Sequence, residues 1–230
     1  MSADPRAIQL VMILRKYGIG ERVLSAIEKT PRDLFVDKPF EQAAWENTAL
    51  PIACGQTISQ PLIVAYVSQA LMIEPQMRVL ELGTGSGYQA AVLARLCRRV
   101  YTIERHKPLL AQAEARFKKL KLDNIVTRHA DGLNGWPEQA PFDRILLSAA
   151  VADVPLILID QLKPGGRLIA PVGSVPKSNV LPPVESVSQR LVQIILGQDG
   201  PERTELIPVM YVPMVAGLPA REGDERDSKP

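Results

Sequence analysis

The segment Val79–Tyr88 constrains the fold most, because it predicts a buried strand that runs directly into a glycine turn and then a helix. Its three alternating glycines allow turn conformations closed to bulkier residues, and they let a ligand lie against main-chain N–H groups. A second strand-like run, 99 to 103, leads into Glu104, which places a carboxylate about 20 residues downstream, where a ribose diol would be held. Together the two features predict a nucleotide-binding corner.

The spacing of the loop limits which nucleotide it can hold. A dinucleotide fingerprint has its third glycine at the position occupied here by Tyr88, and no Gly-Lys-Ser/Thr triplet follows Gly83 as in a triphosphate loop. An acidic residue, Glu81, precedes the glycines and no cation accompanies them, which favours a ligand that carries positive charge. S-adenosylmethionine carries a sulfonium and an ammonium, and the segment resembles the cofactor loop of Rossmann-like methyltransferases.

Composition narrows the class of protein. The 27 basic and 25 acidic residues give a formal net charge of +2, which does not indicate a nucleic-acid or membrane partner. The two cysteines, Cys54 and Cys97, have no metal-ligand spacing, and their number fits a reducing compartment. The longest nearly apolar stretch, 146 to 159, is too short to span a bilayer. We expect a soluble, cytoplasmic, monomeric protein without a metal.

The order of predicted elements gives the fold class. Two amphipathic helices open the chain, and strands then alternate with helices from 61 to 172, which predicts a doubly wound, mostly parallel seven-stranded α/β sheet. We expect helices at 5–17, 20–29, 62–72, 88–97, 108–121 and 154–162, and strands at 78–82, 99–103, 124–129, 142–147, 166–171, 188–196 and 205–214. The predicted organisation is a helical extension with a substrate-site loop (1–60), a cofactor-binding core (61–220) and a disordered tail (221–230).

Proline and glycine mark two breaks in the second half. The run Lys163–Gly166 combines a proline with two glycines, which predicts the end of a helix. The stretch 174–186 contains three prolines and predicts a loop long enough to cover the site.

Further segments resemble the protein-L-isoaspartate O-methyltransferase family over roughly residues 6 to 215. The most specific is Gly55–Pro61 (Gly-Gln-Thr-Ile-Ser-Gln-Pro), because the general methyltransferase fold does not require it. The others are Thr30–Val36, Leu50–Ile52, Gln161–Leu168 and the closing Met210–Met214, which looks like the family's last strand.

The resemblance implies an enzyme that transfers the methyl group of S-adenosylmethionine to the free carboxyl of L-isoaspartyl residues in damaged proteins and peptides. The ester then collapses to a succinimide, which begins repair. Ser59 matches the family's active-site serine, Glu104 its ribose-binding acid, and Asp131 with Gly132 its adenine-side motif. The predicted substrate site is Gln56, Thr57, Ile58 and Ser59; the predicted cofactor site is Glu81, Gly83, Thr84, Gly85, Ser86, Gly87, Glu104, Arg105, Asp131 and Gly132.

Each singled-out residue also has a purely structural interpretation. Ser59 precedes a proline-initiated helix and could be its N-cap. Glu104 could cap the next helix or pair with Arg105, and Asp131 before a glycine could be an ordinary turn residue. Glu81 could be a buried acid satisfied by loop N–H groups.

Two other functions remain open at this point. One is a methyltransferase of the same fold that acts on a small molecule or nucleic acid, the latter disfavoured by the near-neutral charge. The other is a binding protein that keeps the fold without catalysis. The expected chemistry needs no general base, because a carboxylate with a pKa near ~4 is already ionised at neutral pH; we therefore expect no catalytic or metal role for His106 or His129.

Overall fold

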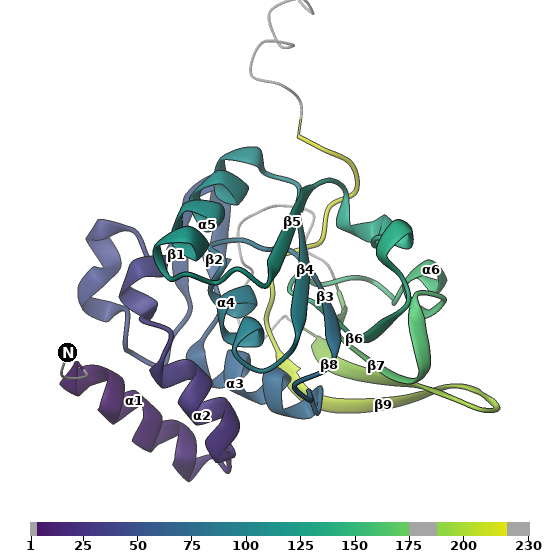
Figure 1. Cartoon of the computed structure of the whole chain (residues 1–230), viewed down its shortest axis with the longest axis horizontal. Coiled ribbons are helices and arrows are strands. Elements are labelled where there is room, and N and C mark those ends of the chain that lie inside the picture. Colours follow the sequence, from purple (N-terminus) through teal and green to yellow (C-terminus); the bar gives the residue numbers. More distant parts are fainter. Residues whose placement is uncertain (1–3, 175–187, 220–230) are drawn as a thin grey trace, which may run out of the picture.

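A mixed seven-stranded sheet forms the centre of the computed structural model, which describes residues 4–174 and 188–219 (Figure 1). The strand order is β5-β4-β3-β6-β7-β8-β9, with parallel pairing from β5 to β7 and antiparallel pairing of β8 and β9. The strands are β3 (Arg78–Leu82), β4 (Arg99–Glu104), β5 (Ile125–His129), β6 (Phe142–Leu147), β7 (Leu162–Gly173), β8 (Gln189–Gly197) and β9 (Gly200–Val209). The predicted fold class is confirmed.

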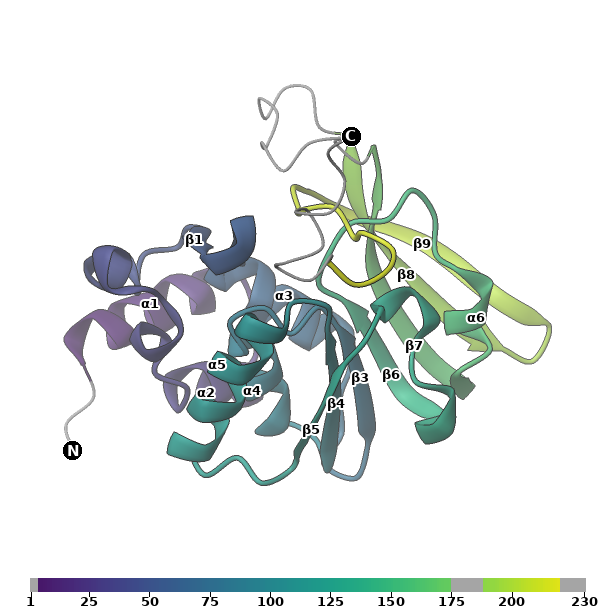
Figure 2. The same ribbon diagram turned by 90° about the horizontal axis from the view of Figure 1, so that it is seen from above.

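The two faces of the sheet are covered unequally. Successive strand residues point to opposite faces, so Val79 joins one apolar cluster with residues of the first helices, while Leu80 and Leu82 join a second cluster. Figure 2 shows α3, α4 and α5 on one side of the sheet and the short α6 on the other. The α-helices are α1 (Pro5–Lys16), α2 (Glu21–Glu28), α3 (Pro61–Ala70), α4 (Tyr88–Ala94), α5 (Lys107–Lys119) and α6 (Leu156–Ile159). None of the helices in the described ranges is long and apolar enough to cross a membrane.

The segment before the sheet contains more than the two predicted helices. After α1 and α2 come two 3-10 helices, η1 (Arg32–Phe35) and η2 (Lys38–Ala43). A small hairpin follows, in which β1 (Leu50–Ile52) pairs antiparallel with β2 (Gln56–Ile58) around η3 (Ala53–Gly55). Three-residue strands are too short to produce a recognisable alternation, which is why sequence periodicity did not reveal them.

The region around β7 corrects the predicted elements. Helix α6 is a single turn rather than the predicted 154–162, and Lys163–Gly166 does not end it: these residues lie inside β7, which begins at Leu162. The pairing of β7 with β6 shifts register there, and Gly165 adopts a positive φ of 74°. Proline and glycine thus mark an irregularity within a strand rather than a boundary.

The last strand also differs from the prediction. β9 spans Gly200–Val209 rather than 205–214, because a two-residue turn after Gly197 starts it early. Met210–Met214 is therefore not the last strand; it runs beyond the sheet, and Pro213 forms an isolated bridge with Ala150. Apart from Ser174, the predicted loop at 174–186 lies outside the described residues, as does the tail from 221.

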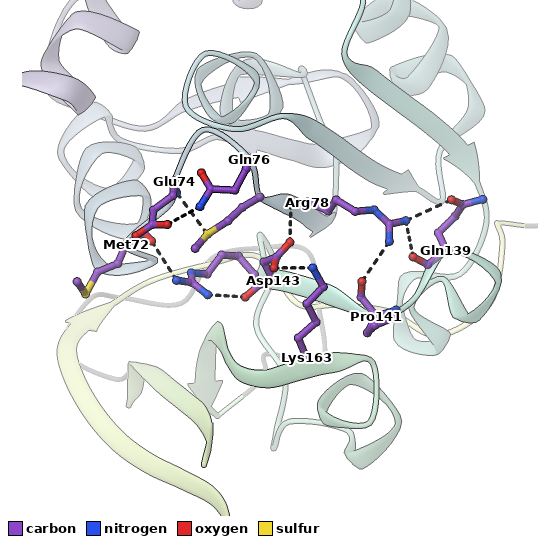
Figure 3. Close-up of polar contacts among 10 residues, drawn as sticks. Met72, Glu74, Gln76, Arg78, Gln139, Pro141, Asp143 and Lys163 are labelled. Atoms are coloured by element: carbon purple, nitrogen blue, oxygen red, sulfur yellow. Dashed lines mark hydrogen bonds and ion pairs between the residues drawn. The ribbon is translucent and has the colours of Figure 1, made fainter. Parts of the chain in front are cut away.

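The amino edge of the central strands carries a network of charged groups (Figure 3). Asp143, at the start of β6, accepts hydrogen bonds from the Lys163 ammonium at 2.7 Å and the Arg78 backbone N–H at 2.8 Å. The Arg78 guanidinium donates to the carbonyls of Gln139 and Pro141 and lies 5.0 Å from the centre of the Tyr101 ring. At this edge the charged side chains are therefore bound by one another and by backbone groups of the protein.

Candidate active site

The predicted glycine loop connects β3 to α4 at the carboxyl edge of the sheet. Gly83, Gly85 and Gly87 have φ values of 98°, 53° and 91°. A Cβ on Gly87 would lie 2.8 Å from the Phe117 ring, so this glycine is required for the close approach of α4 and α5. The Gly83 N–H donates to the carbonyl of Ile103 at 2.8 Å, which fixes the loop against β4.

A cleft opens above the carboxyl ends of β3, β4 and β6. It brings most of the predicted substrate and cofactor residues to one place, although they come from four separate segments of the chain. The predicted residues that line it are Gln56, Thr57, Ile58, Ser59, Gly83, Thr84, Gly85, Ser86, Glu104, Arg105 and Gly132. Three predicted cofactor residues, Glu81, Gly87 and Asp131, do not line it.

Glu104 is the last residue of β4 and is 5% exposed. One carboxylate oxygen, Oε2, accepts from the Gly85 N–H at 2.8 Å, and the other, Oε1, accepts from the His106 N–H at 2.9 Å. His106 is the N-cap of α5, so the structural interpretation of Glu104 holds in part. A carboxylate has about four acceptor positions, so two remain for the hydroxyls of a ligand in the cleft.

Glu81 is fully buried behind the cleft. Its carboxyl accepts from the Thr102 hydroxyl at 2.6 Å and the Ser148 hydroxyl at 3.4 Å, while Thr102 also shares a 2.7 Å hydrogen bond with Thr84. Burial raises the pKa of Glu81 to about 8, although both hydroxyl partners act in the opposite direction. Hydroxyl groups, rather than the predicted loop N–H groups, therefore hydrogen-bond this acid. One of these partners, Ser148, lines the cleft.

Asp131 serves as a turn and anchor residue. Its Oδ1 accepts from the Leu133 N–H at 2.9 Å, which caps the 3-10 helix η4 (Gly132–Asn134), and its Oδ2 accepts from the Gly217 N–H at 2.7 Å. Arg105 donates to the carbonyl of the same Gly217 at 3.0 Å. These two predicted cofactor residues therefore hold the segment after β9 across the end of the cleft.

Ser59 is half-buried and lies between β2 and α3. It is not the helix cap: the N-cap of α3 is Gln60, whose side chain makes no capping bond, and Asn47 Oδ1 accepts from the Leu62 N–H instead. The Ser59 side chain lies near the phenol of Tyr211, whose pKa burial raises. Ser59 lines both the cofactor cleft and a second, adjoining cavity, so it stands where two ligands would meet.

Sequence reasoning missed a set of residues that also form the cleft. Four of them, 212–215, follow β9; three of these belong to Met210–Met214, which the sequence indicated as a strand rather than as part of the cleft. Another, Ser148, directly follows β6. Ligands of such sheets bind at the carboxyl ends of the strands, so this position could have indicated Ser148. The missed lining residues are Val64, Tyr88, Gln89, Ile103, His106, Ser148, Ala149, Val212, Pro213, Met214 and Val215.

The donor set fits S-adenosylmethionine on observations from the cleft itself. Glu104 has acceptor positions left for a ribose diol, Gly83 and Gly85 line the cleft without side chains, and Val212–Val215 provide an apolar wall. Within 4–174 and 188–219 no group of three or more His, Cys, Asp or Glu could hold a metal ion.

Comparison with known proteins agrees with this site. Residues 6–218 match the family model described as protein-L-isoaspartate(D-aspartate) O-methyltransferase. Proteins named protein-L-isoaspartate O-methyltransferase from Paramagnetospirillum magneticum and Rhodospirillum rubrum are 57% and 53% identical to this chain. The matches cover 94% and 96% of this chain, and 98% of each relative.

Solved structures give the same result at lower identity. A structure named protein-L-isoaspartate O-methyltransferase aligns with a TM-score of 0.79 and 26% identity, covering 90% of this chain and 65% of that longer chain. A second, from Plasmodium falciparum and described as a complex with S-adenosyl-L-homocysteine, is 24% identical, with a TM-score of 0.74 over 90% of this chain and 97% of its own; it supports the fold. The chain belongs to the protein-L-isoaspartate(D-aspartate) O-methyltransferase family.

Proposed function

We propose that this protein transfers a methyl group from S-adenosylmethionine to the free carboxyl of L-isoaspartyl residues in damaged proteins and peptides. The observation that carries the proposal is the position of Ser59, which lines both the glycine-loop cleft and the adjoining cavity. A cofactor in the first and a polypeptide in the second would meet at this hydroxyl. Relatives that carry the corresponding name at 57% and 53% identity support the same activity.

The cofactor would be held by the carboxylate of Glu104 and the backbone of the loop Gly83–Gly87. When bound, it supplies an electrophilic methyl group on a sulfonium. Gly132 and the apolar wall 212–215 complete the cleft, and Asp131 and Arg105 hold that wall in place through Gly217. Glu81 takes part indirectly, by fixing Thr102 and Ser148 behind the cleft.

The remaining task of the chain is to orient the substrate. Gln56, Thr57 and Ile58 form β2 and bring Ser59 to the cleft, where its hydroxyl can donate to one oxygen of the isoaspartyl carboxylate. The other oxygen is then free to face the methyl group. Since the carboxylate is already ionised, the rate enhancement comes from alignment and exclusion of water rather than from proton transfer.

We also propose which parts of the chain hold the substrate and the cofactor, and where and in what state the protein acts. Residues 1–60 supply the substrate segment and residues 61–220 supply the cofactor groups. The net charge of +2 supports a protein that acts without a nucleic-acid or membrane-surface partner. The small number of cysteines supports a cytoplasmic location, and we propose a monomer, which light scattering of the purified protein would test.

One assay tests the activity. The protein is incubated with methyl-labelled S-adenosylmethionine and a peptide pair that differs only in an isoaspartyl or aspartyl linkage. The proposal expects a base-labile methyl ester on the isoaspartyl peptide alone. Equal labelling of both peptides, or labelling of neither, would contradict it.

A further inference from the structure

The start of helix α3 is stabilised from outside the helix. A helix leaves its first N–H groups without intrahelical partners, and an N-cap side chain usually satisfies one of them. Here Pro61 has no N–H and the N-cap Gln60 makes no capping bond with its side chain. The Leu62 N–H instead donates to Oδ1 of Asn47 at 2.9 Å, across 15 residues of chain.

Asn47 makes a second contact on the other side of the same junction. Its backbone carbonyl accepts from the Gln60 side-chain amide, Nε2, at 2.9 Å. One half-buried residue therefore binds both Gln60 and Leu62, the residues that flank Pro61 immediately after Ser59. Asn47 also lines the cavity that adjoins the cofactor cleft and that Ser59 shares.

The neighbour of Asn47 is itself anchored in the core. The carbonyl of Thr48 accepts from Nη2 of Arg32 at 3.3 Å, and the Arg32 side chain is fully buried. The Arg32 guanidinium lies 4.8 Å from the centre of the Tyr88 ring, and Tyr88 lines the cofactor cleft. Asn47 is thus connected through its neighbour to the buried Arg32 side chain on one side and to the serine segment on the other.

We propose that Asn47 is a positioning residue for methyl transfer: by holding Gln60 and Leu62, it fixes where the Ser59 hydroxyl meets the substrate carboxylate. This inference rests on the proposed function, in which Ser59 orients that carboxylate. A displacement of about 1 Å at a reacting group can cost on the order of 100-fold in rate, so loss of a hydrogen bond at this junction should be visible in turnover.

The test compares three variants of the full chain. Asn47→Ala removes the acceptor for the Leu62 N–H, whereas Asn47→Asp keeps it. Asn124→Ala is the matched control, because Asn124 is also half-buried and its side chain also joins two segments, donating to the carbonyls of Ala94 and Cys97 away from the cleft. Each variant is measured for kcat and KM with an isoaspartyl peptide, Kd for S-adenosylmethionine, and Tm.

The expected result separates positioning from stability. Asn47→Ala should lower kcat about 10- to 100-fold with Kd for the cofactor within about twofold, and Asn124→Ala should lower Tm without lowering kcat. Asn47→Asp should restore most of kcat, with a higher KM because its charge repels the substrate carboxylate. Wild-type kcat in Asn47→Ala, or an equal fall in kcat in both alanine variants, would overturn the inference.

A measurement without substrate keeps this inference distinct from the proposed activity. Amide hydrogen exchange at Leu62 should be faster in Asn47→Ala than in wild type and unchanged in Asn124→Ala. If the wild-type protein methylates no isoaspartyl peptide, the proposed function fails and the positioning role fails with it, even where the exchange result shows that Asn47 holds the segment. If the wild type is active and exchange at Leu62 is unchanged in Asn47→Ala, only the inference about Asn47 fails.

Discussion

At the two edges of the central sheet, the pKa values of two carboxyl groups are shifted in opposite directions. At the amino edge, burial would raise the pKa of Asp143, but the Lys163 ammonium and the Arg78 N–H outweigh it and lower that pKa (Figure 3). At the carboxyl edge, the carboxyl of Glu81 accepts from two hydroxyls, and burial raises its pKa to about 8. Both acids belong to neighbouring strands, β6 and β3, so the difference arises from their partners and burial rather than from the type of element.

The contrast shows how one sheet separates stability from function. The amino edge pairs its charges within the protein, which supports the folded state. The carboxyl edge keeps acceptor capacity on Glu104 and hydroxyls on Ser59 and Ser148 at the cleft, where a ligand can use them. Variants at the two edges should therefore affect different measurements.

The largest expected effect is the pH dependence of stability at Glu81. Its pKa is raised in the folded state, so between about pH 4.5 and 8 the unfolded chain has lost this proton while the folded protein keeps it. Wild type should lose about 1.4 kcal/mol of unfolding free energy per pH unit relative to Glu81→Gln across that window. Urea unfolding of both proteins from pH 4.5 to 8 measures this; a constant difference would contradict the raised pKa.

Glu104, at the carboxyl edge, is expected to contribute to cofactor affinity. Charge-assisted hydrogen bonds are worth about 1.5–3 kcal/mol, so Glu104→Gln should weaken S-adenosylmethionine binding roughly 10- to 150-fold. Titration calorimetry gives the affinity, and circular dichroism checks that the variant is folded. Unchanged affinity in a folded variant would remove Glu104 from the cofactor site.

Ser59 should affect turnover without affecting the fold. Because Asn47 rather than Ser59 caps α3, Ser59→Ala should change Tm little and leave cofactor affinity nearly intact. Misplacement of the substrate oxygen should lower the single-turnover rate by ~100-fold. A variant with a normal rate and a lowered Tm would return Ser59 to a structural role.

Asp143 should show the opposite pattern at the amino edge. Asp143→Ala removes the partner of the Lys163 ammonium and of the Arg78 N–H, and should cost about 2 kcal/mol of unfolding free energy at neutral pH. The lowered pKa means that this stabilisation is present above the unfolded pKa and is lost as the pH falls through the folded pKa, so the cost should shrink below about pH 4. Turnover per folded molecule should equal that of wild type.

The smallest expected effect is at the histidines. His106→Gln combined with His129→Gln should keep the single-turnover rate at saturating cofactor within a few-fold of wild type, because the substrate carboxylate needs no base. A loss of about 100-fold, the size expected for removal of a general base, would show that proton transfer contributes.

The sequence by itself determined the features that depend on local patterns. The segment that contains Ser59 was identified through its resemblance to the family. The strand, glycine loop and helix around Gly83–Gly87 and the acid at the end of the next strand are readable from spacing and residue type. Each depends on backbone conformations and periodicities within about 20 residues, which glycine, proline and apolar alternation specify directly. The parallel sheet follows from the same alternation of elements.

Tertiary structure decided which partner each polar group has. The cap of α3 by Asn47, the Gly217 contacts of Asp131 and Arg105, and the hydroxyl surroundings of Glu81 join segments separated by 15 to 112 residues. No local pattern specifies such contacts, because they depend on how the apolar clusters bring whole elements together. The same reason explains the misassigned helix end at Lys163–Gly166: a proline and glycines break local structure, but only the neighbouring strand determines whether the chain leaves the sheet or continues in it.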